Sequence, residues 1–475
     1  MIWIAAAALL AAAAIFVLSR RGLSAGRVGR LARLGSLGAR LSASRVGATL
    51  RRLFASRDRR VRIDEARRHA DAALVTQTMG EMKGALMKLG QMLSFIHDDI
   101  PVEYRAALAS LQAAAPPMDF ALLRDVAENE LGKPLERAFA RFEAAPLASA
   151  SIGQVHRARL PDGREVVVKI QYPGVAEAIA ADLANASVLY RFVGMMYPAL
   201  DPKPVVEELR SRITEELDYA REAVNQAKFA TRWAGHPFVR IPAVVGSHST
   251  ARVLTSELAS GRRFIEALDA PQELRDRWGE VIYRFVFSSI IRAGMFNGDP
   301  HPGNYLFGDD GAVTFLDFGC VKYFPDAMLR DWRALVRAHL GGEPATFRKQ
   351  LVTLGFFPES SSLDADRLFK YFGFFYEPFS RDRTFTFTKE YTARSLRMVF
   401  APDGEFTGMT KQMNMPPDFV FVNRIQWGVY SILSSLRASG NFHRIHREYL
   451  FGEAAATEMG RAEEEVAGDE RRLPL

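Results

Sequence analysis

The sequence predicts an α+β fold with two lobes, a small strand-rich lobe followed by a larger helical lobe. Three short strands are predicted between residues 146 and 170, separated by a turn of small residues and an Asp-Gly hairpin. A second hairpin pattern follows residue 304, and the chain beyond it has mostly helical periodicity. Strands grouped in one part of a chain and helices in another are typical of α+β proteins.

The composition is that of a globular protein, with 475 residues, 48% hydrophobic and 25% charged. The single cysteine, Cys320, excludes an intramolecular disulfide, and a reducing, ATP-containing compartment fits best. Residues 19–62 contain 13 Arg and one acid, so this segment carries +12 and the remainder of the +7 chain nets −5. Because the basic charge belongs to one segment, no nucleic-acid partner is expected.

Residues 1–18 form an uncharged apolar run, which as a helix would extend about 27 Å, close to the thickness of a bilayer core. Arg20 and Arg21 follow the run, and the basic start of a cleaved signal peptide is missing. The positive-inside rule therefore predicts a single-pass N-terminal anchor with the body in the cytoplasm. A buried or interfacial apolar helix is the alternative. Residues 19–62 are predicted to be an Arg-rich juxtamembrane linker, either an amphipathic helix on anionic lipid or a flexible chain.

A helical extension is predicted for residues 63–140. Its first helix runs to about His97, where the segment before Pro101 ends it. Lys88 and Gln91 are three positions apart and share one face of this helix, away from its apolar face. By spacing alone, such residues are more often exposed to solvent than functional.

Residues 141–260 have the layout of a kinase N-lobe, in which a loop between the first strands covers the phosphates and a strand lysine, here Lys169, reaches them. The loop has alanine and serine where glycines are expected, and each Cβ restricts the backbone. We therefore expect its phosphate contact to be tighter or differently shaped. The loop residues predicted to bind the nucleotide are Ala148, Ser149, Ala150, Ser151, Ile152, Gly153 and Gln154.

An acidic helix is predicted from about Val205 to Phe229. Asp218 and Glu222 are four residues apart and face one side of it. Glu216 lies about 200° from Asp218 on an ideal helix, so the two cannot contact one ligand unless the backbone changes between them. A solvated acidic face is the alternative.

Residues 252–258 are predicted to form a strand that leads into the interlobe hinge. Backbone groups near Glu257 and Leu258 are candidates for binding an adenine edge, although a plain strand end has the same pattern. Further along the chain, the His-Arg-Asp and Ala-Pro-Glu motifs of protein kinases are absent. Both absences argue against an ordinary protein kinase.

The chemistry is concentrated between residues 297 and 319. Asp299 and Asn304, followed by an apolar strand and Asp317-Phe318-Gly319, repeat the order in which kinases present a base and two magnesium ligands. A hairpin over residues 305–316 would fold Asp317 back beside Asn304, where both oxygens can bind Mg²⁺. Asp299 would then deprotonate or orient a nucleophile. An ordinary hairpin with turn-forming Asp and Asn is the alternative.

The helical lobe is expected to extend over residues 261–451. Its aromatic clusters at 371–376 and 419–422 are predicted to pack in the core, with a groove for an isoprenoid lipid as the alternative. Residues 452–475 are rich in Ala, Glu and Arg and are predicted to be a disordered tail.

Over roughly residues 75–440, the chain resembles the UbiB/ABC1/ADCK family of atypical kinase-like proteins, also called AarF. The resemblance implies a protein-kinase-like two-lobe fold with a family-specific N-terminal helical extension. One departure is Ser149, where the all-alanine form of the loop would have Ala. The matching motifs are Lys88-Leu89-Gly90-Gln91, the loop 148–154, Lys169 to Gly174, Glu216 to Asn225, Asp299 to Asn304, and Asp317-Phe318-Gly319.

The resemblance also implies that the extension folds over the active site. Lys88, with Gln91 beside it, would be a regulatory group that reaches the nucleotide pocket and the acids Glu216 and Asp218. Glu222 would pair with Lys169, whereas Glu216 and Asp218 would face Lys88 or a metal. An extension that covers the active site in this way would exclude a peptide substrate.

The sequence therefore predicts a membrane-anchored, ATP-binding, Mg²⁺-dependent ATPase with ATP or ADP and Mg²⁺ as cofactors. Its expected role is to support isoprenoid-quinone (ubiquinone-type) or other lipid metabolism, and this part rests on the resemblance and the anchor. A membrane lipid, such as an isoprenoid or quinone precursor, and lipid-biosynthesis enzymes are the expected partners. The alternatives are a non-catalytic, nucleotide-gated scaffold and a phosphotransferase acting on a small-molecule, lipid or protein hydroxyl.

Overall fold

The computed structural model describes most of the chain from residue 118 onward. The predicted anchor, the Arg-rich linker, the helix with Lys88 and Gln91, and the residues Ser151 and Asp299 lie outside the described part. Within the described part, no helix is both long enough and apolar enough to cross a membrane. The described residues are 118–150, 152–183, 207, 210, 214–298, 300–400, 406, 409, 413, 414 and 416–467.

The chain divides into two compact units, which are described separately. The larger unit comprises residues 124–147, 155–170 and 218–475 and contains nearly all of the strands and the helical core. The smaller unit comprises residues 1–123, 148–154 and 171–217, and its described elements include α8 (Val175–Leu183). The helices α6 (Phe120–Leu131) and α7 (Leu135–Ala138) lead into the first strand.

A four-stranded sheet in the order β1-β2-β3-β5 confirms the predicted strands. β2 and β3 are joined by the predicted Asp-Gly turn, where Gly163 has φ 92°, a conformation that glycine adopts without a Cβ clash. In β3, Val166, Val168 and Ile170 are fully buried and alternate with Lys169 on the other face. The strands are β1 (Arg141–Ser149), β2 (Gly153–Arg159), β3 (Glu165–Gln171) and β5 (Val253–Glu257).

α11 (Tyr219–Arg232) packs against β5, and the helix predicted to run unbroken from 205 to 229 is interrupted before it. Residues 214–216 are helical, but Asp218 has φ −115° and ψ 90°, and its carboxylate accepts the Arg221 amide at 3.1 Å. An aspartate in this position satisfies an amide that has no partner within the helix, so a new helix begins there. The prediction of one continuous helix is therefore wrong, and the ideal-helix angle between Glu216 and Asp218 does not apply.

Two small sheets carry the segment between residues 295 and 323. β7 (Tyr305–Phe307) and β8 (Val313–Phe315) pair antiparallel with Tyr305 opposite Phe315, which confirms the predicted hairpin. β4 (Val239–Arg240) adds to β8 in parallel. β6 (Met295–Asn297) pairs antiparallel with β9 (Val321–Tyr323), so the strands that flank the hairpin in sequence are hydrogen-bonded to each other.

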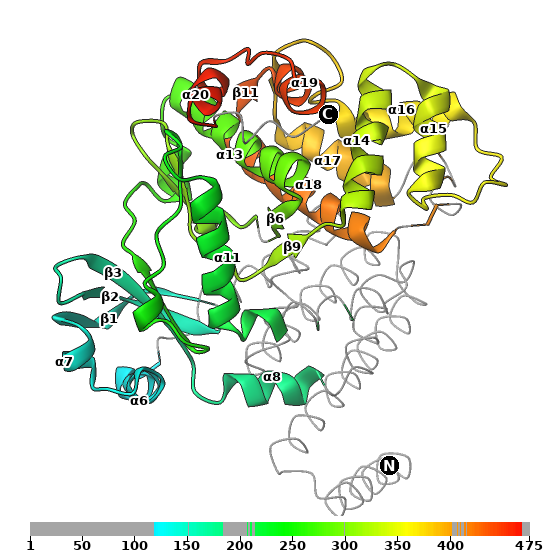
Figure 1. The fold of residues 1–475 in the computed structure, drawn as a ribbon. Helices are drawn as coiled ribbons and strands as arrows, with labels where there is room; N and C mark the ends of the chain where they lie inside the picture. Colours follow the sequence, from blue (N-terminus) through cyan, green and yellow to red (C-terminus); the bar gives the residue numbers. More distant parts are fainter. Residues whose placement is uncertain are drawn as a thin grey trace, which may run out of the picture. The chain divides into compact units, whose positions relative to one another are not determined.

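The helical core is built around α13 (Gln272–Ala293), which is buried along most of its length and contacts α18 and α19 (Figure 1). Gly294 ends α13 with φ 61°, and a Cβ there would lie 2.7 Å from the Leu329 side chain. The other elements are α12 (Phe264–Ala267), α14 (Asp326–Leu340), α15 (Pro344–Thr353), α16 (Ala365–Tyr376), α17 (Lys389–Phe400), α18 (Pro417–Leu436), α19 (Phe442–Phe451), β10 (Phe385–Thr386) and β11 (Ser439–Gly440).

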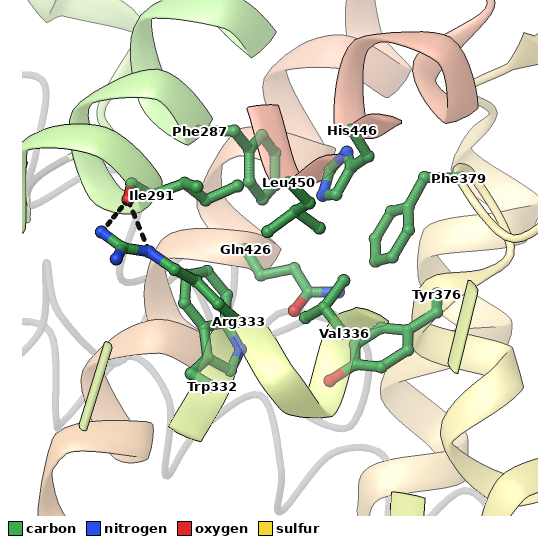
Figure 2. A pocket seen from close by; sticks show the side chains of 10 residues that line it. All are labelled: Phe287, Ile291, Trp332, Arg333, Val336, Tyr376, Phe379, Gln426, His446 and Leu450. Atoms are coloured by element: carbon green, nitrogen blue, oxygen red, sulfur yellow. Dashed lines mark hydrogen bonds between the residues drawn. The ribbon is translucent and has the colours of Figure 1, made fainter. Parts of the chain in front are cut away.

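The side chains that the structure describes in the two aromatic clusters of this lobe are mostly buried in the core, which agrees with the first of the two alternatives drawn from the sequence. Tyr371, Phe375 and Phe419 are each at most 8% exposed. A small cavity lies among α13, α14, α16, α18 and α19 (Figure 2), with room for roughly one water molecule. It is lined mainly by aromatic and aliphatic side chains and is itself too small for a lipid. A lipid groove along these clusters stays a prediction.

Residues 452–475 were predicted to be disordered, but the structure has a helix there, α20 (Glu458–Ala467). The prediction is wrong for this helix. Glu463 is buried and accepts hydrogen bonds from the Tyr449 hydroxyl at 3.0 Å and from Arg284 at 3.3 Å. Arg284, in α13, also donates to Glu448 of α19 at 2.7 Å. A buried guanidinium needs carboxylate partners, and one of them comes from α20. These partners are distant in sequence, so local composition did not reveal them.

Two buried histidines make this lobe sensitive to acid. His446 in α19 stacks on Phe379 at 4.0 Å between ring centroids, and its Nδ1 lies 2.9 Å from the Tyr283 hydroxyl. His339 in α14 lies 3.0 Å from the Ser380 hydroxyl. Burial lowers the pKa of His446 to about 3 and the pKa of His339 to about 4, so both are neutral at pH 7.

We predict that the free energy of unfolding falls as the pH drops from about 6.5 toward 4. In this range the unfolded chain binds protons that the folded chain excludes, at a cost of about 2 kcal/mol per histidine by pH 5. Urea denaturation at pH 7 and pH 5 measures the loss. His339→Gln should lose about 2 kcal/mol less than the wild type between these pH values. Ser380→Ala removes the same hydrogen bond but no titrating group, and should keep the wild-type loss. An unchanged loss in His339→Gln would contradict the prediction.

Candidate active site

Lys169 lies at the centre of an ion-pair cluster formed by three parts of the larger unit. Its Nζ is 2.9 Å from both carboxylate oxygens of Glu222 and 3.7 Å from Oδ2 of Asp317. Lys169 comes from β3, Glu222 from the first turn of α11, and Asp317 from the segment that follows β8. The expected contact between Lys169 and Glu222 is therefore present, and Asp317 is beside it.

The cluster is shielded from solvent on the Glu222 side and open at Asp317. The exposed fractions of the side chains are 3% for Glu222, 17% for Lys169 and 34% for Asp317. Burial, the largest single influence, lowers the pKa of Lys169, but Asp317 and Glu222 together raise it well above its ordinary value. Lys169 is therefore charged. Asp317 is the more accessible of its two carboxylate partners.

Hydrogen bonds from the backbone and from Asn297 hold Asp317 in place. Its Oδ1 accepts the Gly319 amide at 2.9 Å, and its main-chain carbonyl accepts a hydrogen bond from the Asn297 side chain. A Cβ at Gly319 would lie 3.4 Å from both Asp317 Oδ1 and Glu222 Oε2. Glycine therefore keeps the space between the two carboxylates open.

The β7–β8 hairpin brings Asn304 close to the chain before Asp317. The Leu316 amide donates to the Asn304 carbonyl at 3.0 Å. A carboxylate and an amide oxygen are the hard donors that Mg²⁺ takes alongside phosphate oxygens, so these residues fit the expected metal. No group of three or more His, Cys, Asp or Glu with metal-binding geometry occurs among the residues described. Asn304 and Asp317 as metal ligands remain a prediction.

The small-residue loop belongs to the smaller unit. β1 ends at Ser149 and β2 begins at Gly153, and the Ala150 amide donates to the Gly153 carbonyl at 2.8 Å, which closes the turn. Ile152 is 4% exposed and Gln154 is fully buried, with its side-chain oxygen accepting the Met118 amide. The nucleotide contacts expected of residues 148–154 stay predictions.

Hydrogen bonds within the fold already use some of the backbone groups that were predicted to bind an adenine edge. The Glu257 amide donates to the Ala243 carbonyl at 2.9 Å, and the Leu258 amide donates to the Glu165 carbonyl at 3.0 Å. Because both amides are already used, only the carbonyls of these residues remain to contact an adenine edge. Binding of an adenine edge by the carbonyls of Glu257 and Leu258 stays a prediction.

The structure describes the two acids with a predicted regulatory role, Glu216 and Asp218, but not their predicted partners. The carboxylate of Asp218 caps α11, and Glu216 is half-buried at the end of the preceding helical turn. Their predicted partners, Lys88 and Gln91, lie outside the described residues, and so does the predicted base Asp299. These roles stay predictions.

Sequence reasoning missed a contact between α18 and the catalytic loop. A Cβ on Gly428 would lie 2.2 Å from Pro300, the residue after Asp299. α18 also carries Asp418, whose Oδ1 is 2.9 Å from Nζ of Lys322 in β9. α18 therefore supports both the catalytic loop and the strand after the Asp-Phe-Gly segment. The contact joins residues more than a hundred positions apart, so no local signal predicts it.

Comparison with known proteins identifies relatives across most of the chain. Residues 110–346 match the ABC1 atypical kinase-like domain. A solved complex of Rv3197 with erythromycin, from Mycobacterium tuberculosis, is 31% identical with a TM-score of 0.60; the match covers 83% of this chain and 98% of that one. The expected α+β, protein-kinase-like fold class is thereby confirmed.

Curated relatives include organellar kinases. The chloroplastic protein ACTIVITY OF BC1 COMPLEX KINASE 8 of Arabidopsis thaliana is 35% identical over 53% of this chain and 34% of its own length. The mitochondrial atypical kinase COQ8B of Rattus norvegicus is 34% identical over 58% of this chain and 52% of its own length. The mitochondrial atypical kinase coq-8 of Caenorhabditis elegans is 27% identical over 90% of this chain and 58% of its own length. The chain thus spans between a third and three fifths of these relatives.

We predict that Gly428→Ala destabilises the protein, because the new methyl group has no space beside Pro300. Overpacking of this kind costs about 1–3 kcal/mol, more than the roughly 1 kcal/mol that alanine contributes to a helix. Urea denaturation measures the change. Gly373→Ala in α16 is the matched control, since the nearest atom to its Cβ is 3.9 Å away. Equal stability of the two variants would contradict the predicted contact.

Proposed function

The chain belongs to the ABC1 atypical kinase-like family, and on that premise we propose that it binds ATP together with Mg²⁺ at the Lys169–Glu222–Asp317 cluster. The observation that carries the proposal is the geometry of this cluster. A strand lysine is held by both oxygens of a helix glutamate and faces the aspartate of an Asp-Phe-Gly segment. This is the arrangement by which kinase-type enzymes place a lysine and a metal near nucleotide phosphates.

Each residue has a distinct proposed task. Lys169 binds phosphate oxygens as a fixed positive charge, and Glu222 keeps it extended toward the site. Asn304 and Asp317 would hold Mg²⁺, which neutralises charge that develops on the phosphates when it is bound. Asp299 orients or deprotonates the attacking group.

We propose ATP hydrolysis as the reaction, in support of isoprenoid-quinone (ubiquinone-type) or other lipid metabolism. The names of the COQ8 relatives support an atypical kinase, and their mitochondrial or chloroplastic labels support a place near organelle-type membranes. Membrane attachment through residues 1–18, and regulation by Lys88 and Gln91, are parts of the same proposal that concern residues outside the described structure. Lipid-biosynthesis enzymes are the proposed protein partners.

We predict that Asp317→Asn weakens Mg²⁺-dependent ATP binding by at least about tenfold, because an amide is a poorer ligand for a hard cation than a carboxylate. Titration calorimetry with ATP, with Mg²⁺ and then with EDTA, measures the effect. Asp309→Asn is the matched control, since this exposed aspartate lies in the turn of the same hairpin and pairs with Arg262. Unchanged Mg²⁺-dependent affinity in Asp317→Asn would refute the metal assignment.

We predict that γ-labelled ATP yields labelled inorganic phosphate, and that anionic liposomes containing quinone-like lipid raise the rate. Lys88→Ala should change the rate if the extension covers the site. Label on a lipid or protein, abolished in Asp299→Asn, would instead show a phosphotransferase. Tight ATP binding with no labelled product, even with liposomes, would show a nucleotide-gated scaffold. Either outcome replaces the proposed hydrolysis.

A further inference from the structure

Asn225 occupies a buried position between α11 and the Asp-Phe-Gly segment. It lies three residues after Glu222, so both side chains are on one face of α11. Asn225 is 3% exposed. Its Nδ2 donates to the Phe318 carbonyl at 3.2 Å, and its Oδ1 accepts the Tyr323 hydroxyl at 2.9 Å.

The orientation of this amide is fixed by its partners. A main-chain carbonyl only accepts hydrogen bonds, so the NH₂ group of Asn225 must face Phe318. The Tyr323 hydroxyl, from β9, then donates to the remaining oxygen. Both hydrogen-bonding groups of the side chain are therefore used within the larger unit, and neither is directed at a ligand.

The bond from Asn225 acts on the same peptide group that holds Asp317. The carbonyl of Phe318 and the amide of Gly319 belong to one planar peptide unit and point in opposite directions. Asn225 binds the carbonyl end, and the amide end donates to Oδ1 of Asp317 at 2.9 Å. Rotation of this plane would move the amide away from the carboxylate.

The preceding peptide plane is fixed in the same way. The Asn297 side chain donates to the carbonyl of Asp317, in the peptide unit that joins it to Phe318. The Phe318 ring is fully buried and packs on Phe229 of α11 at 4.9 Å between ring centroids. The two peptide planes beside Phe318 and its ring are therefore each held by a separate contact.

We propose that Asn225 is a positioning residue that directs the Asp317 carboxylate toward the metal by fixing the Phe318–Gly319 peptide plane. The metal-binding part of this inference rests on the proposed function, whereas the effect on the peptide plane does not. α11 thus holds two groups of the site together, Lys169 through Glu222 and Asp317 through Asn225.

Gln226 provides a matched control. It is the next residue of α11, is 1% exposed, and donates from its side-chain amide to the Pro242 carbonyl at 2.7 Å. Asn225→Ala and Gln226→Ala therefore each remove one buried amide that binds a main-chain carbonyl. Only the first of these carbonyls belongs to the Asp-Phe-Gly segment.

The first measurement is amide hydrogen exchange of the full-length chain without nucleotide. Asn225→Ala should speed exchange at Gly319 about tenfold, the effect of losing one hydrogen bond, and Gln226→Ala should leave it within about twofold of the wild type. Tyr323→Phe keeps the bond to Phe318 and should have a smaller effect than Asn225→Ala. Equal exchange at Gly319 in wild type and Asn225→Ala would overturn the inference.

The second measurement is the Mg²⁺ concentration that gives half-maximal ATP binding. It should rise about tenfold in Asn225→Ala and stay within about twofold in Gln226→Ala, with ATP affinity in EDTA unchanged in both. An equal rise in both variants would overturn the inference, because it would show a general loss of stability. If wild type shows no Mg²⁺-dependent ATP binding, the proposed function fails, and the exchange result alone decides whether Asn225 orders the segment.

Discussion

The partly buried positive charge of Lys169 is the constraint on which the candidate site depends. An ammonium group with 17% of its side chain exposed needs carboxylates close by, and Glu222 and Asp317 provide them from two other parts of the chain. To meet this need, β3, α11 and the segment after β8 must converge at one point. The same point then presents an ammonium group, which attracts phosphate oxygens, beside a carboxylate, which can be a ligand of a divalent cation.

Contacts outside the ion-pair cluster hold its three elements in place. α11 begins at Asp218, which sets the helix so that Glu222, Asn225 and Phe229 lie along one face. The β6–β9 pair and the side chain of Asn297 hold the Asp-Phe-Gly backbone from the other side. α18 packs on Pro300 and pairs with β9 through Asp418 and Lys322. A site with one lysine and one aspartate is thus maintained by elements from across the larger unit.

The features that sequence reasoning predicted are those encoded by short patterns. The strands around Lys169 and the hairpin between Asn304 and Asp317 follow from alternation and turn residues. The pairing of Lys169 with Glu222 was implied by the family resemblance. The features it missed or mistook depend on partners that are distant in sequence. α20 is ordered through Arg284, and Gly428 contacts Pro300 across the lobe. The break at Asp218 was missed for another reason, because a capping aspartate and an aspartate inside an acidic helix look alike in sequence.

The central claim is that Asp317 and Asn304 bind a metal that is shared with nucleotide phosphates beside Lys169. A crystal structure of the full chain with Mg²⁺ and a non-hydrolysable ATP analogue tests it most directly. The account predicts a metal at roughly 2.1 Å from oxygens of Asp317, Asn304 and the phosphates, with Lys169 in contact with a phosphate oxygen. A nucleotide bound elsewhere, or a metal that Asp317 does not contact, would contradict it.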